Sequence, residues 1–185
     1  MALIGEIQAS IRGGWRLVRR DPGGMTDFNL SVTGFWRSFI AALIVLPLYV
    51  PFSVLEAQRL ETAVGSHVGR ELVGFAAMWV VAPLAMLGLT MLLQRADRFA
   101  ALVIASNWVS VPQYIILAAT HVVAMVIPPG PAPFVLIAVF IWLKVIEYFV
   151  VRTVLEVKPV PAGAVVVITT LASFVINYFV APPGV

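Results

Sequence analysis

The sequence predicts an all-α membrane protein, a polytopic bundle of five transmembrane helices preceded by an amphipathic helix at the membrane surface. Of the 185 residues, 61% are hydrophobic and 11% are charged, whereas about a quarter of the residues of a soluble domain carry a charge. The charges are clustered and leave five apolar stretches, each long enough for a crossing of about 20 residues. A proline-rich turn, IPPGPAP at Ile127–Pro133, separates the third stretch from the fourth.

The first 33 residues are predicted to form a cytosolic amphipathic segment. Its apolar side chains recur at the spacing of one helix face, at Ile4, Ile7, Ile11, Trp15 and Val18. Arginines occupy other faces, and a basic face with a tryptophan at headgroup level suits anionic lipid. We expect a membrane anchor, and the alternative is a docking site for a protein partner. The candidate lipid or partner contacts are Arg12, Trp15, Arg16, Arg19 and Arg20.

Two features oppose or limit this helix. Gly13 and Gly14 each weaken a helix by up to about 1 kcal/mol relative to alanine. The tetrapeptide DPGG at Asp21–Gly24 is predicted to end the helix before the first span.

The transmembrane domain is predicted to occupy residues 34–185, with spans at about 35–55, 72–94, 98–120, 133–152 and 160–181. Residues 121–127 should form an amphiphilic tail that leads into the proline-rich turn. Prolines interrupt the first three spans, and each removes a backbone hydrogen bond and bends its helix. They are Pro47, Pro51, Pro83 and Pro112. Neighbouring helices or water commonly absorb such prolines, so we expect a structural role in preference to a binding site made of broken helices.

Basic residues are distributed unevenly among the predicted connections. Nine of them precede the first span or lie between spans two and three or spans four and five: Arg12, Arg16, Arg19, Arg20, Arg37, Arg95, Arg98, Arg152 and Lys158. The other connections hold only Arg59 and Arg70, offset by three glutamates. Because short loops rich in Lys and Arg remain cytoplasmic, we expect the amino terminus inside and the carboxyl terminus in the periplasm. Arginine outnumbers lysine ten to two, as is typical of GC-rich bacterial genomes, so the predicted location is a bacterial inner membrane.

The fourth span contains two charges, Lys144 and Glu147, within FIWLKVIEYFVVR. If the cytoplasmic edge lies near Val151, they sit about 10 Å and 6 Å inside the span. At spacing i, i+3 they can meet and neutralise each other. We expect an ion pair facing the bundle interior, and the alternative is a functional site, since intramembrane charges often mark one.

Two further spans carry polar stripes. In the third span the stripe consists of Ser106, Ser110 and Gln113, at spacing i, i+4, i+7, with Asn107 beside them, and in the fifth of Thr170, Ser173 and Asn177. Such stripes usually join helices through hydrogen bonds worth about 0.6 kcal/mol each. The alternative is a water-filled path for a substrate or a proton. Together with Lys144 and Glu147, the stripe of the third span is the candidate intramembrane polar site.

The sequence offers no recognisable catalytic constellation. His67 and His121 stand alone, and His67 is expected to be a solvated loop residue. There is no cysteine, no phosphate-binding glycine loop and no zinc-protease or nucleophile-elbow motif. We therefore predict a protein that is not an enzyme and that uses no metal, no cofactor and no nucleic acid.

The stretch LLQRADRFAALVIASNWVSVPQYII at Leu92–Ile116 combines a basic turn, an aromatic residue, a small-apolar helix and a mid-helix proline. In this it resembles the Yip-domain family, the Rab-GTPase-interacting membrane proteins of eukaryotic trafficking and their bacterial relatives. The resemblance covers about residues 34–181 and implies a non-enzymatic multi-span protein. The amino-terminal segment departs from the long acidic region of the eukaryotic members, so Rab binding is not carried over.

Taken together, these features predict a protein that acts through interaction, as an accessory or assembly subunit or a membrane-organising protein. Its expected partners are membrane lipids and other integral membrane proteins or further copies of itself. The alternative is a small transporter or channel that uses the polar residues around Lys144 and Glu147.

Overall fold

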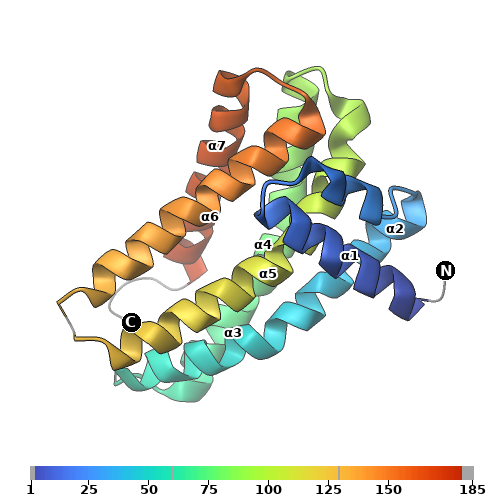
Figure 1. The fold of residues 1–185 in the computed structure, drawn as a ribbon. Helices are drawn as coiled ribbons and strands as arrows, with labels where there is room; N and C mark the ends of the chain where they lie inside the picture. The colour runs from blue at the N-terminus through green and yellow to red at the C-terminus, as the bar shows by residue number, and fades with distance from the viewer. Residues whose placement is uncertain (1–2, 60, 129, 181–185) are drawn as a thin grey trace.

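The computed structural model describes residues 3–59, 61–128 and 130–180, except for the side chains of Arg59, Asn177 and Val180. Within these residues the chain is helical and contains no β-strand, which confirms the all-α prediction (Figure 1). The elements are α1 (Leu3–Val18), the 3-10 helix η1 (Pro22–Asp27), α2 (Val32–Ser38), α3 (Ile40–Arg59), α4 (Val64–Leu92), the 3-10 helix η2 (Ala96–Arg98), α5 (Phe99–Val126), α6 (Ala132–Leu155) and α7 (Pro159–Val180).

Five segments in the described residues are long and apolar enough to cross a membrane: Val32–Gln58, Val64–Leu92, Ala96–Val126, Ala132–Leu155 and Pro159–Ile176. A helix of about 20 residues spans the hydrocarbon layer. The chain is therefore a multi-pass integral membrane protein, and the polytopic bundle expected from the sequence is the observed architecture.

The first span consists of α2 and α3, which are separated by a short break at Phe39. Ser31 caps α2 by accepting a hydrogen bond from the backbone N–H of Gly34 at 3.2 Å. A Cβ on Gly34 would lie 1.9 Å from the carbonyl oxygen of Asn29. Only glycine therefore fits at this close turn of the chain.

Four of the spans are longer than the sequence predicts, and the first continues to Arg59 instead of ending near residue 55. α4 begins at Val64 instead of near residue 72, α5 continues to Val126, and α6 continues to Leu155. His67 consequently lies in α4 and is buried, so the prediction of a solvated loop residue is wrong. Uncharged runs mark the lipid-embedded middle of a helix, whereas hydrogen bonding continues through the charged residues beyond it.

The prolines within the spans do not divide them. α3 runs through Pro47 and Pro51, α4 through Pro83 and α5 through Pro112. This agrees with the structural role predicted for these residues, in which surrounding helices compensate the lost backbone hydrogen bonds.

α5 is the central helix of the bundle. It packs against α1, α2, α3 and α6, while α4 packs against α3 and α7 (Figure 1). The largest fully buried side chains include Leu102 and Ile104 of α5, Ile146 of α6 and Val45 of α3. Lipid tails are as apolar as these side chains, so close van der Waals packing stabilises this interior more than removal from water does.

The connections gather at two opposite ends of the bundle (Figure 1). At one end, the α4–α5 and α6–α7 connections meet where Arg98 Nη2 lies 3.2 Å from Glu156 Oε1. Arg95 also donates to the carbonyl oxygen of Glu156 at 3.4 Å. We call this the α1 end, because α1 crosses the bundle nearer to it. We call the opposite end, which has the α3–α4 and α5–α6 connections, the far end.

Candidate functional site

The two intramembrane charges of α6 form the predicted ion pair. Lys144 Nζ lies 2.7 Å from Glu147 Oε2 and 5.5 Å from the ring centroid of Phe140. Because α6 continues to Leu155, Glu147 lies about 12 Å along the helix from its carboxyl end. The two charges neutralise each other within the bundle.

Glu147 also links α6 to α7. Thr169 Oγ1, on α7, lies 3.0 Å from Glu147 Oε1 and is the donor of this contact. The sequence predicts a polar stripe at Thr170, Ser173 and Asn177 in this span. Thr169 directly precedes Thr170 and is not part of that stripe. In the structure Ser173 donates to the carbonyl oxygen of Thr169 at 2.9 Å, and the side chain of Asn177 lies outside the described part of the chain. The sequence pattern does not determine the rotation of α7 about its axis. In the structure this rotation turns Thr169 toward Glu147.

Two residues of the polar stripe of α5 share a cavity with Glu147. Ser106 and Gln113 line a cavity of about 160 Å³ together with Glu147, and Met86 of α4 closes one wall. Gln113 Nε2 also approaches the backbone oxygen of Leu143 at 3.5 Å. The structure therefore brings Ser106, Gln113 and Glu147 of the predicted site together.

The other two stripe residues, Asn107 and Ser110, form hydrogen bonds with groups other than Glu147. Asn107 is buried and donates from Nδ2 to Ser38 Oγ at 2.9 Å, which ties α5 to α2. Ser110 Oγ donates to the carbonyl oxygen of Asn107 at 2.6 Å. Both residues line a second cavity of about 160 Å³ between α4 and α5, and this cavity shares Ser106 with the first.

A third cavity of about 220 Å³ lies nearer the far end, between α3, α4 and α5. It shares Tyr114 with the second cavity, and in it Tyr49 Oη donates to the carboxylate of Glu71. Sequence reasoning missed this site, because it assigned Glu56 and Glu71 to an outside loop and treated His121 as isolated. The spacing i, i+3, i+7 at Tyr49, Phe52 and Glu56 was the available signal.

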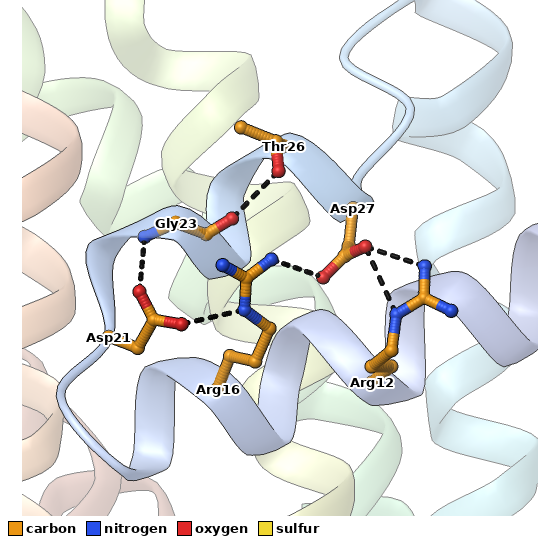
Figure 2. Close-up of polar contacts among 6 residues, drawn as sticks. All are labelled: Arg12, Arg16, Asp21, Gly23, Thr26 and Asp27. Carbon is orange, nitrogen blue, oxygen red and sulfur yellow. Dashed lines mark hydrogen bonds and ion pairs between the residues drawn. The ribbon is translucent and has the colours of Figure 1, made fainter.

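At the α1 end, arginines of α1 are held by acidic residues of the following turn (Figure 2). Arg12 Nη2 lies 2.6 Å from Asp27 Oδ1. Arg16 bridges two carboxylates, with Nε at 2.7 Å from Asp21 Oδ2 and Nη1 at 2.9 Å from Asp27 Oδ2. Asp21 also accepts from the N–H of Gly23 at 2.8 Å and caps η1. The segment from α1 to η1 is therefore closed by charge-assisted hydrogen bonds.

These contacts stabilise the ionised carboxylates. The side-chain hydrogen bond from Arg16 lowers the pKa of Asp21 below its usual range, and the hydrogen bond from Gly23 adds to the effect. The hydrogen bond from Arg12 lowers the pKa of Asp27, where burial acts in the opposite direction and Arg16 contributes a further lowering. The same pairs raise the pKa of Arg16.

α1 is docked closely on the bundle. A Cβ on Gly14 would lie 2.7 Å from the backbone oxygen of Trp108 in α5. Glu6 is buried and accepts hydrogen bonds from Arg37 at 2.6 Å and from Asn29 at 3.0 Å. Of the two glycines that weaken the helix prediction, Gly14 thus permits the approach of α1 to α5, and Gly13 permits the approach of η1 to α1.

The five predicted lipid or partner contacts therefore divide into two groups. Arg12 and Arg16 are held in intramolecular ion pairs, and Trp15 is partly buried against the core. Arg19 and Arg20 are exposed. Arg20 lines a groove with a volume of about 520 Å³ beside α6, whose walls include Arg152, Val145, Tyr148 and Phe149.

Within the described residues, no three side chains of His, Asp or Glu are arranged to hold a metal ion. Comparisons of the chain with protein-family models, curated proteins and solved structures found no significant match. The helices and the geometry of these polar groups are therefore the basis for the function proposed below.

Proposed function

We propose that this protein works by binding anionic membrane lipid and neighbouring membrane proteins, and not by catalysis. The groove beside α6 is the observation that carries the proposal, because it pairs two exposed guanidinium groups, from Arg20 and Arg152, with an apolar wall that includes Val145 and Phe149. Glu156 also lines the groove, and its carboxylate is paired with Arg98. A phospholipid has the same two-part chemistry. Its phosphate suits arginine, which binds it through parallel hydrogen bonds, and its acyl chain suits the apolar wall.

The proposed location is a bacterial inner membrane, with the α1 end in the cytoplasm and the carboxyl terminus in the periplasm. The support is the uneven distribution of Lys and Arg among short connections. At the α1 end these charges are set to meet the anionic surface of the inner leaflet, where each exposed basic residue contributes about 1 kcal/mol of attraction.

The proposed role is that of an accessory subunit, an assembly subunit or a membrane-organising protein. Exposed apolar side chains of the spans, such as Leu84 and Leu171, are available to lipid or to helices of a partner or of a further copy. The resemblance of Leu92–Ile116 to the Yip-domain family implies the same kind of role and remains a prediction.

Lipid binding tests the proposal directly. The full chain is purified in detergent, and its retention of phosphatidylglycerol is measured by native mass spectrometry at low salt. The double variant Arg20→Gln/Arg152→Gln should bind roughly 30-fold more weakly, because each lost guanidinium removes a direct hydrogen bond to the lipid phosphate worth about 1 kcal/mol.

Lys158→Gln is the matched control, since Lys158 is an exposed basic residue near the same end that does not line the groove. It should bind almost as well as the parent. Equal binding by the parent and the double variant, or equal weakening by the control, would contradict the proposal.

A second candidate function is a small transporter or channel. It is favoured by the series of adjoining cavities from Glu147 through Ser106 and Tyr114 to Glu71. On this hypothesis, Lys144→Met and Glu147→Gln abolish ion or proton flux into proteoliposomes while the protein remains inserted. Parental flux in both variants, or no flux in the parent, removes the candidate.

A further inference from the structure

The cavity near the far end has an unusual combination of walls. One face of α3 contributes Tyr49, Phe52, Ser53 and Glu56, which follow the helical spacing i, i+3, i+4, i+7. α4 contributes Glu71 from the opposite side. Aromatic rings and carboxylates therefore surround one small volume of about 220 Å³.

The charged residues that line this cavity are Glu56 and Glu71, and the lining also includes His121. Tyr49 Oη donates to Glu71 and holds that carboxylate at the wall, while a carboxylate can accept about four hydrogen bonds and so has capacity for a ligand. Glu56 also lines the cavity and is exposed to solvent. A positively charged ligand would meet opposite charge from both carboxylates.

The rings offer a complementary surface. The centroids of Tyr49 and Tyr114 lie 6.4 Å apart at an interplanar angle of 71°, so the two rings form a corner. Phe52 lies 5.2 Å from the ring of His121. Faces of tyrosine and phenylalanine attract cations, and rings grouped in this way are a known means of binding substituted ammonium groups.

Two polar atoms at the wall point to a ligand that also forms hydrogen bonds. Ser53 is 5% exposed, and its hydroxyl has no hydrogen-bond partner within the described residues. Buried hydroxyls almost always have a partner. His121 Nδ1 lies 2.9 Å from the carbonyl oxygen of Leu117. A carbonyl only accepts, so Nδ1 carries a proton, and Nε2 is left for a further hydrogen bond.

We propose that this cavity binds a small organic cation, an ammonium group with a short hydroxyl-bearing substituent. The ammonium group lies against Tyr49 and Tyr114 and is neutralised by Glu71 and Glu56, and the substituent hydroxyl pairs with Ser53. The volume sets an upper limit on size, because drug-sized ligands occupy cavities of roughly 300–1,000 Å³. This site lies toward the opposite end of the bundle from the lipid groove, so the two proposals stand or fall separately.

Binding of choline to the purified full chain, measured by isothermal titration calorimetry in detergent, tests the site. The comparison ligand is 3,3-dimethylbutan-1-ol, which has the shape and hydroxyl of choline but no charge. We expect choline to bind at least about tenfold more tightly than this neutral analogue, because the cation–ring and charge interactions are absent in the analogue. Equal affinity for both compounds, or no binding of choline to folded protein, overturns the proposal.

Variants locate the binding in this cavity. Glu56→Gln and Glu71→Gln should each weaken choline binding by about tenfold, and Ser53→Ala should weaken it by a smaller factor. Glu56 is exposed, so its variant tests the site even if Glu71→Gln disturbs the fold through Tyr49. Glu61→Gln is the matched control, because Glu61 is an exposed carboxylate of the α3–α4 connection that does not line the cavity. Unchanged binding in Glu56→Gln, or equal weakening in Glu61→Gln, overturns the assignment.

Discussion

At the residue scale, a few small or polar side chains determine how the helices meet. Gly14 allows the backbone of α1 to contact Trp108 of α5. Glu147 receives Lys144 from its own helix and Thr169 from α7. Because apolar surface gains little by leaving lipid for the bundle interior, such close approaches and hydrogen bonds contribute much of the specificity of the fold.

Gly14→Ala should loosen the docking of α1. The added Cβ would lie 2.7 Å from a backbone oxygen, and a rigid clash of this kind destabilises by about 1–3 kcal/mol. The melting temperature in detergent should fall, and trypsin should cleave after Arg12 or Arg16 more rapidly.

Gly5→Ala is the control for this substitution. A Cβ on Gly5 meets nothing within 4 Å, so the variant should gain up to about 1 kcal/mol in helix propensity. If both variants have the same stability, close packing of α1 on α5 is not what fixes the helix.

At the element scale, α1 and η1 behave as one unit. Arg16 joins Asp21 to Asp27, and Arg12 makes a second contact with Asp27 (Figure 2). Glu6 fastens the same unit to Arg37 of α2. The unit therefore holds the exposed Arg20 beside the groove of α6.

The stability of this unit should depend on pH in the acidic range. The pKa values of Asp21 and Asp27 are lowered in the folded chain, so their contribution is fully present above the unfolded value of about 3.9. It is lost as the pH falls through the lower, folded values. Thermal unfolding between pH 7 and pH 2 should show a decline that begins below about pH 4.

Asp27→Asn separates this effect from general acid unfolding. The variant lacks the charge at every pH, so its melting temperature should lie below that of the parent at pH 7, and the difference should shrink toward pH 2. A difference that stays constant over this range would show that the ionisation of Asp27 does not stabilise the unit.

At the scale of the whole molecule, the chain has two chemically different ends. The α1 end gathers arginines of α1, of the α4–α5 connection and of α6, and both Arg95 and Arg98 contact Glu156. The far end has the acidic and aromatic cavity with Glu56 and Glu71. The proposed orientation puts the basic end against anionic lipid and the acidic cavity nearer the periplasm.

The absence of cysteine from the sequence makes this orientation directly testable. Single substitutions Glu61→Cys and Lys158→Cys place one thiol at each end. In intact cells, a membrane-impermeant maleimide should label Glu61→Cys, whereas Lys158→Cys should be labelled only after the inner membrane is permeabilised. The reverse pattern would invert the proposed topology.

The features predicted correctly from the sequence are those that depend on the residues of one helix alone. The spans follow from apolar length, and the Lys144–Glu147 pair follows from the i, i+3 spacing on one helix. The ends of α4, α5 and α6 do not follow, because helices continue past the apolar segment. The burial of His67 was missed for the same reason.

The sequence by itself determined that this is an all-α, five-span membrane protein with clustered charges. It also determined that Lys144 and Glu147 can form an ion pair, since length, hydropathy and helical spacing are local properties. Only the tertiary structure decided that Thr169 meets Glu147, that Gly14 docks α1, that Arg12 and Arg16 are occupied by Asp21 and Asp27, and that Ser53 and Glu71 share a cavity. Each of these contacts depends on the rotation and approach of helices distant in sequence. In a membrane, the uniformly apolar helix surfaces leave that rotation undetermined until the few small and polar residues find their partners.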